Sequence, residues 1–372
     1  MRIMFVAGGT GGHINPAVAV AKEIKRLNPN AEILFVGTEG RMETQIVPKA
    51  GFNIKTVEMN GFSRNLSLKG IMENIKTVTL TLKASSKAKE IIKEFNPDVV
   101  VGFGGYVTGP VLRTAAKMGI KTAIHEQNAF PGVANKALAK LVDKVMLTSA
   151  AAEKYMSCKN PPVVTGLPVR REIVKGDRDF ARAALGLREN DMLVLSMGGS
   201  LGADAINNAV IGMLQKLQGE SNLLFLHVTG KLGSWVWDAL KEKGINHGKG
   251  TNIEIREYID NMDICLPACD LVISRAGASS ISEIQALSKP SILIPSPNVA
   301  ENHQFHNAMT LAENDGAILI EEKNLDSEIL VKTVLDLKNN PAKLCDISKN
   351  AGKNARLNAL SEICTIITDL AK

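Results

Sequence analysis

The sequence contains few cysteines, and none of them forms a recognisable metal-binding pattern. Five cysteines occur among 372 residues, in odd number and without a C-x-x-C motif. Cys265 and Cys269 are four residues apart on a predicted helix, but no second pair or neighbouring histidine completes a zinc site. The sequence therefore predicts no metal ion and no cofactor. The pattern is typical of reduced thiols in a cytosolic protein.

Long hydrophobic runs are also absent. No apolar stretch approaches the roughly 18 residues that a membrane-spanning helix needs. Residues 3–7, which follow Met1 and Arg2, are apolar but too few for the core of a signal peptide. We therefore expect a soluble chain, which can still adhere to a membrane surface.

Aromatic residues make up only 4% of the chain, and no stripe of basic residues is interleaved with them. The formal net charge of +6 is modest, and the lysines and arginines are spread along the sequence. This distribution argues against a nucleic-acid partner. A mild positive excess suits an anionic substrate or an anionic membrane surface equally well.

Three glycine-rich loops are the main positive signal, and each follows a short apolar run. They are GGTGGH at 8–13, GFGGYVTGP at 102–110 and GGSLGA at 198–203. A glycine loop between a strand and a helix leaves backbone N–H groups unpaired at the positive end of the helix dipole. Two loops in the first half of the chain and one in the second predict two α/β domains facing across a cleft that holds a diphosphate or a carboxylate.

Strand-like and helix-like segments alternate along the chain, which predicts two Rossmann-like domains with parallel sheets. The strand candidates are 3–7, 32–36, 54–58, 98–101, 122–125, 144–147, 163–165, 192–197, 223–229, 252–256, 270–274, 291–295 and 316–320. The sequence Gly-Leu-Pro-Val at 166–169 is the best linker candidate. We therefore place the first domain at 1–166 and the second at 167–353, and expect the helical segment 354–370 to pack back on the first domain.

The first loop departs from the common nucleotide-binding motifs. Counted from Gly9, the pattern GxGxxG fails at Ile14, and no Gly-Lys-Ser/Thr of a P-loop follows. Pro16 suits the first turn of a helix over 17–27. His13 would lie at the start of that helix, where the dipole disfavours a charged imidazole, so a neutral ring could accept a proton. A histidine that merely hydrogen-bonds across the loop is an equal alternative.

Four consecutive polar residues, His125-Glu126-Gln127-Asn128, follow the strand predicted at 122–125. They precede Gly132 and a helix, and such a cluster is unusual in a purely structural turn. The pattern therefore favours side chains that face a ligand at the carboxyl end of the sheet.

The segment SRAGASSISE at 274–283 follows another predicted strand. The N–H groups of Ala278, Ser279 and Ser280 would face a phosphate at the start of a helix. Glu283, one turn later, could accept hydrogen bonds from both hydroxyls of a ribose. A capping box, Ser280-x-x-Glu283, fits the spacing equally well.

Two other motifs have weaker functional readings. Residues 177–179 have the DxD spacing of metal-dependent sugar transferases, but they precede a predicted helix, where solvated acids are the simpler explanation. The loop 295–304 ends at Gln304 in hydrogen-bonding groups that suit a sugar. His303 and His306 are three residues apart, but no third ligand completes a metal site.

An apolar stripe with helical spacing runs through the segment 68–95. Its members are Ile71, Ile75, Val78 and Leu82, and lysines flank them. A stripe of this kind suits an interfacial contact with a membrane. A helix that packs on its own sheet gives the same pattern, and is the commoner case.

Six motifs of this chain resemble, in order and spacing, those of the N-acetylglucosaminyltransferases of bacterial peptidoglycan synthesis. The motifs are GGTGGH, GFGGYVTGP, HEQN, GLPVR, GGSLGA and SRAGASSISE, and the match runs from Arg2 to the end of the sequence. The resemblance implies the GT-B glycosyltransferase fold. It also implies a peripheral protein at the cytoplasmic face of the membrane, and it strengthens the membrane reading of the stripe.

The resemblance further implies a reaction. N-acetylglucosamine passes from UDP-N-acetylglucosamine to the 4-hydroxyl of an undecaprenyl-diphosphate-linked muramoyl-pentapeptide, with inversion. The catalytic base would be His13, with Glu126 as second choice. The implied substrate-binding residues are Thr10, Gly11, Gly12, Asn128, Arg170, Ser200, Ile259, Ala278, Ser279, Ser280, Glu283 and Gln304. A UDP-N-acetylglucosamine 2-epimerase, a transferase that uses diacylglycerol and a non-catalytic UDP-sugar sensor remain alternatives.

Overall fold

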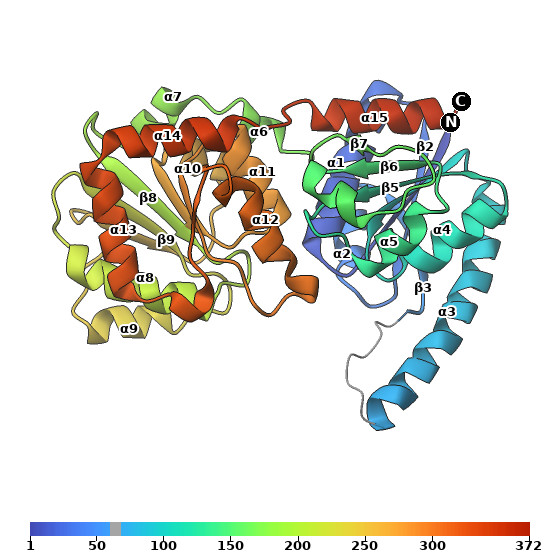
Figure 1. The fold of residues 1–372 in the computed structure, drawn as a ribbon, viewed down its shortest axis with the longest axis horizontal. Coiled ribbons are helices and arrows are strands. Elements are labelled where there is room, and N and C mark those ends of the chain that lie inside the picture. Colours follow the sequence, from blue (N-terminus) through green and yellow to red (C-terminus); the bar gives the residue numbers. More distant parts are fainter. Residues whose placement is uncertain (60–67) are drawn as a thin grey trace. The chain divides into compact units, whose positions relative to one another are not determined.

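The structure, a computed structural model, describes residues 1–59 and 68–372, with the side chains of 68–76 and 78 outside the description. The chain divides into two compact units (Figure 1). Unit 1 comprises Met1–Pro168 and Leu357–Lys372, and unit 2 comprises Val169–Arg356.

Unit 1 is built on a parallel sheet with the strand order β3-β2-β1-β4-β5-β6-β7. In chain order the strands are β1 (Arg2–Ala7), β2 (Glu32–Thr38), β3 (Asn53–Val57), β4 (Val99–Gly104), β5 (Lys121–Glu126), β6 (Lys144–Leu147) and β7 (Val163–Val164). β1 after its first residue, Arg2, and the whole of β4 are apolar and buried, because both faces of the sheet are covered.

Helices cover both faces of this sheet. One face carries α3 (Leu68–Phe95), α4 (Thr108–Lys117) and α5 (Val133–Ala139), with the short helix η1 (Ala150–Tyr155) beside them. The other face carries α1 (Gly11–Leu27), α2 (Glu43–Lys49) and α15 (Ala359–Leu370). α15 reaches this core from far along the sequence, since Ile363 and Ile367 are fully buried in the cluster that contains Phe5.

Unit 2 repeats the architecture with the strand order β10-β9-β8-β11-β12-β13, again parallel. The strands are β8 (Met192–Met197), β9 (Leu223–Val228), β10 (Ile253–Arg256), β11 (Leu271–Ser274), β12 (Ser291–Leu293) and β13 (Ile318–Leu319). The helices are α6 (Arg171–Val174), α7 (Arg178–Ala184), α8 (Asp204–Leu217), α9 (Val236–Glu242), α10 (Met262–Ala268), α11 (Ala278–Ala286), η2 (Ala300–Asn302), α12 (His303–Ala312), η3 (Glu322–Asn324), α13 (Ser327–Asn339) and α14 (Pro341–Gly352).

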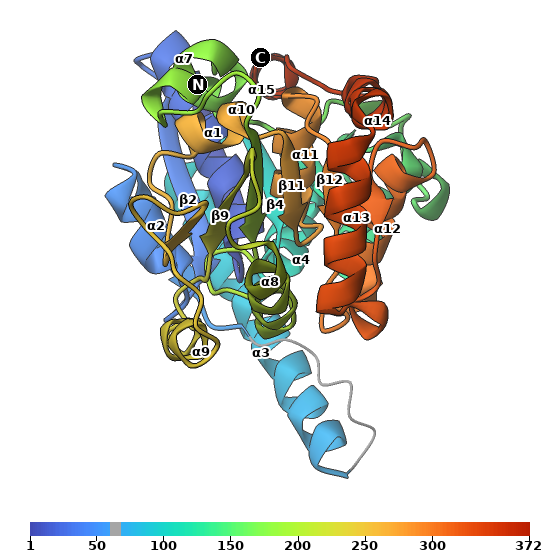
Figure 2. The same ribbon diagram turned by 90° about the vertical axis from the view of Figure 1, so that its left-hand side faces the viewer.

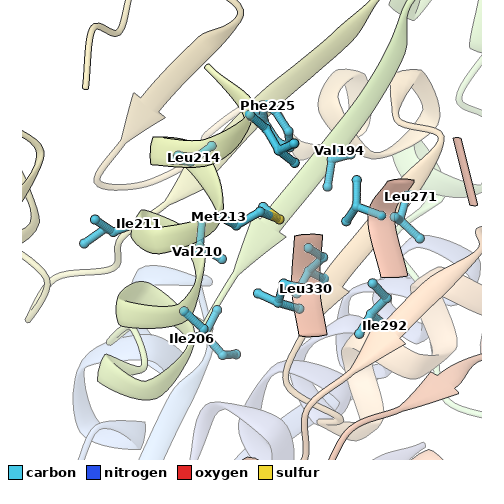
Figure 3. Close-up of a cluster of buried hydrophobic side chains, with 14 of the residues drawn as sticks. Val194, Ile206, Val210, Ile211, Met213, Leu214, Phe225, Leu271, Ile292 and Leu330 are labelled. Carbon is cyan, nitrogen blue, oxygen red and sulfur yellow. The ribbon is translucent and has the colours of Figure 1, made fainter. Parts of the chain in front are cut away.

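The core of unit 2 has one layer on each face of the sheet. On one face, α8 and α13 lie side by side (Figure 2). There Met213 and Leu214 of α8 meet Phe225 of β9 and Leu330 of α13 (Figure 3). On the other face Leu195 packs among residues of α7, α10 and α11. Helices thus cover both faces of the sheet, which leaves the ends of the strands for ligand binding.

The thirteen predicted strands are all present, with ends that differ by at most three residues. One helix start was wrong. α1 begins at Gly11 rather than at residue 17, so Pro16 lies inside the helix instead of in its first turn. The Gly11-Gly12 pair forms the first residues of the helix, and Gly12 is exposed, so water can satisfy the carbonyl group that Pro16 cannot serve.

α3 carries the predicted membrane stripe. The side chains of Ile71, Ile75 and Val78 lie outside the described residues, whereas Leu82 is 69% exposed. Figure 1 shows the first half of α3 extending beyond the other helices of unit 1. Across residues 1–59 and 68–372, no helix has both the length and the apolar content needed to cross a membrane.

Candidate active site

In each unit the strand order reverses at one point, and ligands of doubly wound sheets bind beyond the carboxyl ends of the strands at this point. The reversal lies between β1 and β4 in unit 1, and between β8 and β11 in unit 2. The three glycine-rich loops follow β1, β4 and β8, and SRAGASSISE follows β11. The sequence motifs therefore lie at the carboxyl ends of the strands that flank the reversal, which is where the topology predicts a ligand.

The two glycine-rich loops of unit 1 are in contact. The N–H group of Gly8 donates to the carbonyl of Gly104 over 3.2 Å. A Cβ atom on Gly105 would lie 2.4 Å from the carbonyl oxygen of Gly8, and one on Gly104 would lie 2.7 Å from the ring of His13. The second loop therefore needs its glycines in order to approach the first loop so closely.

His13 lies in the first turn of α1 and is half-buried. Its Nδ1 atom is 3.0 Å from the carbonyl oxygen of Gly8 and 3.3 Å from Oγ1 of Thr10. A carbonyl oxygen only accepts hydrogen bonds, so Nδ1 carries the proton of the neutral ring and Nε2 carries the lone pair. The bond across the loop thus exists, and it makes Nε2 the basic nitrogen. The role of His13 as general base stays a prediction.

The sequence analysis missed Glu43, the first residue of α2. Its side chain is fully buried, and its two carboxylate oxygens accept hydrogen bonds from the N–H groups of Thr38 (2.8 Å) and Gly9 (3.2 Å). An acid at the start of a helix ordinarily stays in solvent and stabilises the dipole, so the sequence carried no signal for burial. Glu43 therefore holds the first glycine-rich loop from its buried side, through the N–H group of Gly9.

The HEQN cluster is mostly buried, which corrects the expectation that all four side chains face a ligand. His125, Glu126 and Gln127 are at most 3% exposed, whereas Asn128 is half-exposed. The physical reason is local packing and hydrogen bonding: the ring of His125 stacks on Phe103 with centroids 5.3 Å apart, and Asn135 of α5 donates to Glu126. Burial lowers the pKa of His125 to about 4, and the neutral ring bonds to the carbonyl of Gly166.

Glu126 uses both of its carboxylate oxygens to hold the loop that follows it. Oε1 accepts from the backbone N–H (2.9 Å) and Nδ2 (3.3 Å) of Asn128, and Oε2 accepts from the N–H of Gly132 (3.1 Å) and from Nδ2 of Asn135 (2.8 Å). Asn135 is a second residue that the sequence analysis did not single out. These contacts fit a support for the loop better than a mobile proton acceptor, so His13 is the stronger candidate for the base.

In unit 2 the loop GGSLG, residues 198–202, packs closely against neighbouring backbone. A Cβ atom on Gly202 would lie 2.2 Å from the carbonyl oxygen of Thr229, and one on Gly230 would lie 2.1 Å from the nitrogen of Gly202. The N–H group of Lys231 donates to the carbonyl of Ser200 over 3.2 Å. Ser200 itself is exposed at the tip, where its hydroxyl can contact a ligand.

α11 begins directly after β11 with an uncapped end. Gly277 has the extended backbone of an N-cap and no side chain, and the first turn contains no acidic residue. The N–H groups of Ala278, Ser279 and Ser280 have no carbonyl partner within the helix. Ser280 is the third helical residue, so the capping-box alternative is wrong. The extended backbone belongs to Gly277, three residues earlier.

Glu283, one turn into α11, pairs with Arg170. The guanidinium Nη2 lies 3.1 Å and Nε 3.4 Å from the same carboxylate oxygen. Burial raises the pKa of Glu283, and the charge of Arg170 opposes this shift. Two residues that the resemblance implies in donor binding are thus brought together.

The other implied donor residues of unit 2 differ in exposure. Gln304 is half-buried, and its Oε1 accepts from the N–H of Ser296 over 2.9 Å, which closes the loop between them. Ile259 is 5% exposed and its side chain packs in the core. The side chain of Ile259 is therefore not available to a ligand.

The DxD-like segment is a helix start, as the simpler explanation predicted. Asp177 is the N-cap of α7, and its side chain accepts from the N–H of Phe180 over 2.8 Å. Within the parts of the chain that are described, no three His, Cys, Asp or Glu side chains form a group that could hold a metal ion.

Comparisons with known proteins identify one glycosyltransferase family over most of the chain. Residues 3–147 match the glycosyltransferase family 28 N-terminal domain, and residues 193–363 match the family 28 C-terminal domain. A protein of Acetivibrio thermocellus is 42% identical over 100% of this chain and 99% of its own length, and one of Desulforamulus reducens is 43% identical over 98% and 97%. Both are named UDP-N-acetylglucosamine–N-acetylmuramyl-(pentapeptide) pyrophosphoryl-undecaprenol N-acetylglucosamine transferase.

Solved structures agree with this assignment. The crystal structure of Acinetobacter baumannii MurG is similar with a TM-score of 0.81 and 27% identity, over 99% of each chain. UDP-GlcNAc 2-epimerase from Neisseria meningitidis reaches a TM-score of 0.64 at 15% identity, over 99% of this chain and 100% of that one. At 15% identity the likeness to the epimerase shows the fold alone.

Proposed function

The chain belongs to glycosyltransferase family 28, and from this premise we propose that it makes the disaccharide lipid precursor of peptidoglycan. It is a transferase that moves N-acetylglucosamine from UDP-N-acetylglucosamine to undecaprenyl-diphosphate-linked N-acetylmuramoyl-pentapeptide, as its full-length relatives are named to do. The acceptor atom is the 4-hydroxyl of the muramoyl sugar, and the anomeric carbon inverts.

The observation that carries the donor assignment is the uncapped start of α11. Three backbone N–H groups, at Ala278, Ser279 and Ser280, meet the positive end of the helix dipole, and no side chain of the helix neutralises them. This is an arrangement for a diphosphate. Ser200 on the neighbouring loop and Arg170 supply further donors, so UDP can depart as a stabilised anion.

We assign the remaining contacts with the nucleotide sugar by the parts of UDP-N-acetylglucosamine that they suit. Glu283 accepts hydrogen bonds from the ribose hydroxyls, and the backbone at Ile259 contacts the base. Gln304 closes the sugar end of the site. We therefore assign residues 167–353 to the nucleotide sugar.

We assign residues 1–166 to the lipid acceptor, with Thr10, Gly11, Gly12 and Asn128 as substrate contacts. The lone pair on Nε2 of His13 takes the proton of the acceptor hydroxyl as that oxygen bonds to C1 of N-acetylglucosamine. The bond between C1 and the diphosphate oxygen breaks, and its electron pair leaves with UDP. Inversion follows, because attack and departure occur on opposite sides of C1.

The acceptor is anchored in a membrane, so the enzyme works at a membrane surface. We place it at the cytoplasmic face as a peripheral protein that contacts anionic lipid through the stripe of α3, and we assign it no nucleic-acid partner. The support is Leu82, which is 69% exposed on a helix that carries lysines.

The test is transfer of labelled N-acetylglucosamine from its UDP donor to a short-chain muramoyl-pentapeptide diphosphate lipid, with and without EDTA. A disaccharide lipid in both samples supports the proposal, including the stabilisation of UDP by protein donors. Conversion of free donor to another hexosamine would support the epimerase instead, and transfer to diacylglycerol alone would identify a different acceptor.

A further inference from the structure

Glu43 is an acid in an unusual place for a charged side chain. It begins α2 on the face of the sheet that also carries α1, and none of its surface is exposed. A buried carboxylate is costly unless it is hydrogen-bonded, so its contacts define its task. Those contacts are with the N–H groups of Thr38, next to α2, and of Gly9, in the first glycine-rich loop.

Two glycines make room for this carboxylate. A Cβ atom on Gly8 would lie 2.5 Å from Oε1 of Glu43, and one on Gly37 would lie 2.6 Å from its Cγ. The loop and the strand β2 therefore close on the side chain from two sides. Glu43 thus holds the loop in addition to the bond between Gly8 and Gly104.

The loop segment that Glu43 holds at Gly9 also contacts the imidazole of His13. Gly9 follows Gly8, and the carbonyl oxygen of Gly8 lies 3.0 Å from Nδ1 of His13. That carbonyl keeps the proton on Nδ1 and the lone pair on Nε2. A shift of the loop would move the acceptor that fixes both the ring orientation and the tautomer.

We propose that Glu43 is a positioning residue for the transfer reaction, which acts through the first loop to set the tautomer and orientation of His13. The inference rests on the proposed function, because His13 is the base of that reaction. It assigns the buried acid a role in rate rather than in substrate contact, since Glu43 has no exposed surface.

A double-mutant cycle tests the inference. Glu43→Gln keeps the shape of the side chain but replaces one acceptor oxygen with a donor group, and we expect kcat to fall by up to about 10²-fold, as a small misplacement of a catalytic group can cause. His13→Ala alone should lower kcat by about 10²–10⁴-fold. On the His13→Ala background, Glu43→Gln should change kcat by less than about twofold, because the residue it acts through is gone. Additive losses would overturn the inference.

Glu23→Gln is the matched control. Glu23 is 8% exposed in the same unit, and both of its carboxylate oxygens accept from the guanidinium of Arg26, one turn along α1. We expect its kcat to stay within about twofold of that of the unaltered protein. A wild-type chain that fails to transfer at all would contradict the proposed function, and is thereby distinguishable from failure of this inference.

The tautomer of His13 provides a readout that needs no turnover. In ¹⁵N spectra of the imidazoles, assigned with His13→Ala, the unaltered protein should carry its proton on Nδ1, and Glu43→Gln should give a mixture of tautomers. An unchanged Nδ1–H signal would overturn the inference. If Glu43→Gln does not fold, Gly37→Ala displaces the same carboxylate from the side of β2 and is expected to give the same two results.

Discussion

The loop after β1 in unit 1 and the loop after β8 in unit 2 look alike in sequence but are supported differently. In the first, GGTGGH, the N–H group of Gly9 donates to the carboxylate of Glu43, and in the loop after β5 the N–H groups of Asn128 and Gly132 donate to that of Glu126. The second, GGSLG, is held by backbone contact between Gly202 and Gly230. Carboxylates therefore support the loops after β1 and β5 in unit 1, while the described contacts of the loop after β8 in unit 2 are between backbone groups.

This difference fits a division of work between the units. Unit 1 places an imidazole in the first turn of α1, and in the proposed reaction its proton transfer requires a fixed tautomer. Unit 2 offers backbone N–H groups and hydroxyls at the start of α11, which in the proposed reaction bind the diphosphate without exchanging protons. The comparison predicts that changes in unit 1 affect the rate of chemistry, and that changes in unit 2 affect the affinity for UDP.

His13→Ala is the largest expected effect. The loss of the base should lower kcat by about 10²–10⁴-fold, while the Kd for UDP, measured by calorimetry, stays within about twofold. Retention of more than a tenth of the activity would show that His13 is not the base. It would also contradict the prediction that changes in unit 1 act on the rate of chemistry.

Acid should destabilise both units through one buried histidine in each. Burial lowers the pKa of His125 and of His227 to about 4, against about 6.5 in the unfolded chain. Between these values the unfolded chain binds protons that the folded chain does not, so stability falls as pH falls. The expected loss from pH 7 to pH 5 is about 2 kcal/mol per histidine, measured by urea unfolding.

The two histidines can be told apart by substitution. The glutamine of His227→Gln cannot take up the proton. The loss of stability between pH 7 and pH 5 should therefore be smaller than in the unaltered protein by about 2 kcal/mol, the contribution of one histidine. A pH dependence equal to that of the unaltered protein would show that His227 does not contribute.

Glu283→Ala should weaken UDP binding by about 1–3 kcal/mol, because hydrogen bonds to the ribose are lost. At saturating donor, kcat should change little, in contrast to His13→Ala. Thermal stability should change little, since Gly277 and not Ser280 begins the helix, and since the side chain of Arg170, the partner of Glu283, is 56% exposed and can be solvated when the ion pair is lost. A drop in stability with intact UDP affinity would give Glu283 a structural role.

Asp177→Ala should have the smallest effect, the loss of one helix cap at about 1 kcal/mol. Asp326 is the matched control, because it caps α13 with the same hydrogen bond, accepting from the N–H of Ile329 over 2.8 Å. Both variants should lose similar stability and keep full transfer activity, with or without Mg²⁺. A loss of activity confined to Asp177→Ala would revive the metal-binding interpretation of the DxD spacing.

The fold could be predicted from the sequence because strands and helices alternate and are separated by loops with glycine and proline residues. Apolar runs such as 192–197 must be buried on both faces, and parallel order follows from the helices between them. The loops of the site could be predicted for the same reason, since glycines after strands mark the edge where ligands bind.

The support beneath those loops could not be predicted. Glu43 and Asn135 act through contacts with residues that are distant in sequence, and no local pattern distinguishes them from surface residues. Burial at 125–127 was misjudged because polar residues at a strand end suggest exposure, whereas β5 is covered there. The start of α11 depended on the backbone at Gly277, which the Ser280–Glu283 spacing cannot reveal.

The position of α15 has a consequence for how the chain folds during synthesis. Unit 2 contains one continuous segment, Val169–Arg356, and can complete its core as soon as that segment leaves the ribosome. Unit 1 starts first but must wait, because Ile363 and Ile367 fill its core last. The earlier-made unit is therefore the later to close, and its apolar surface is exposed to chaperones while the whole of unit 2 is being made.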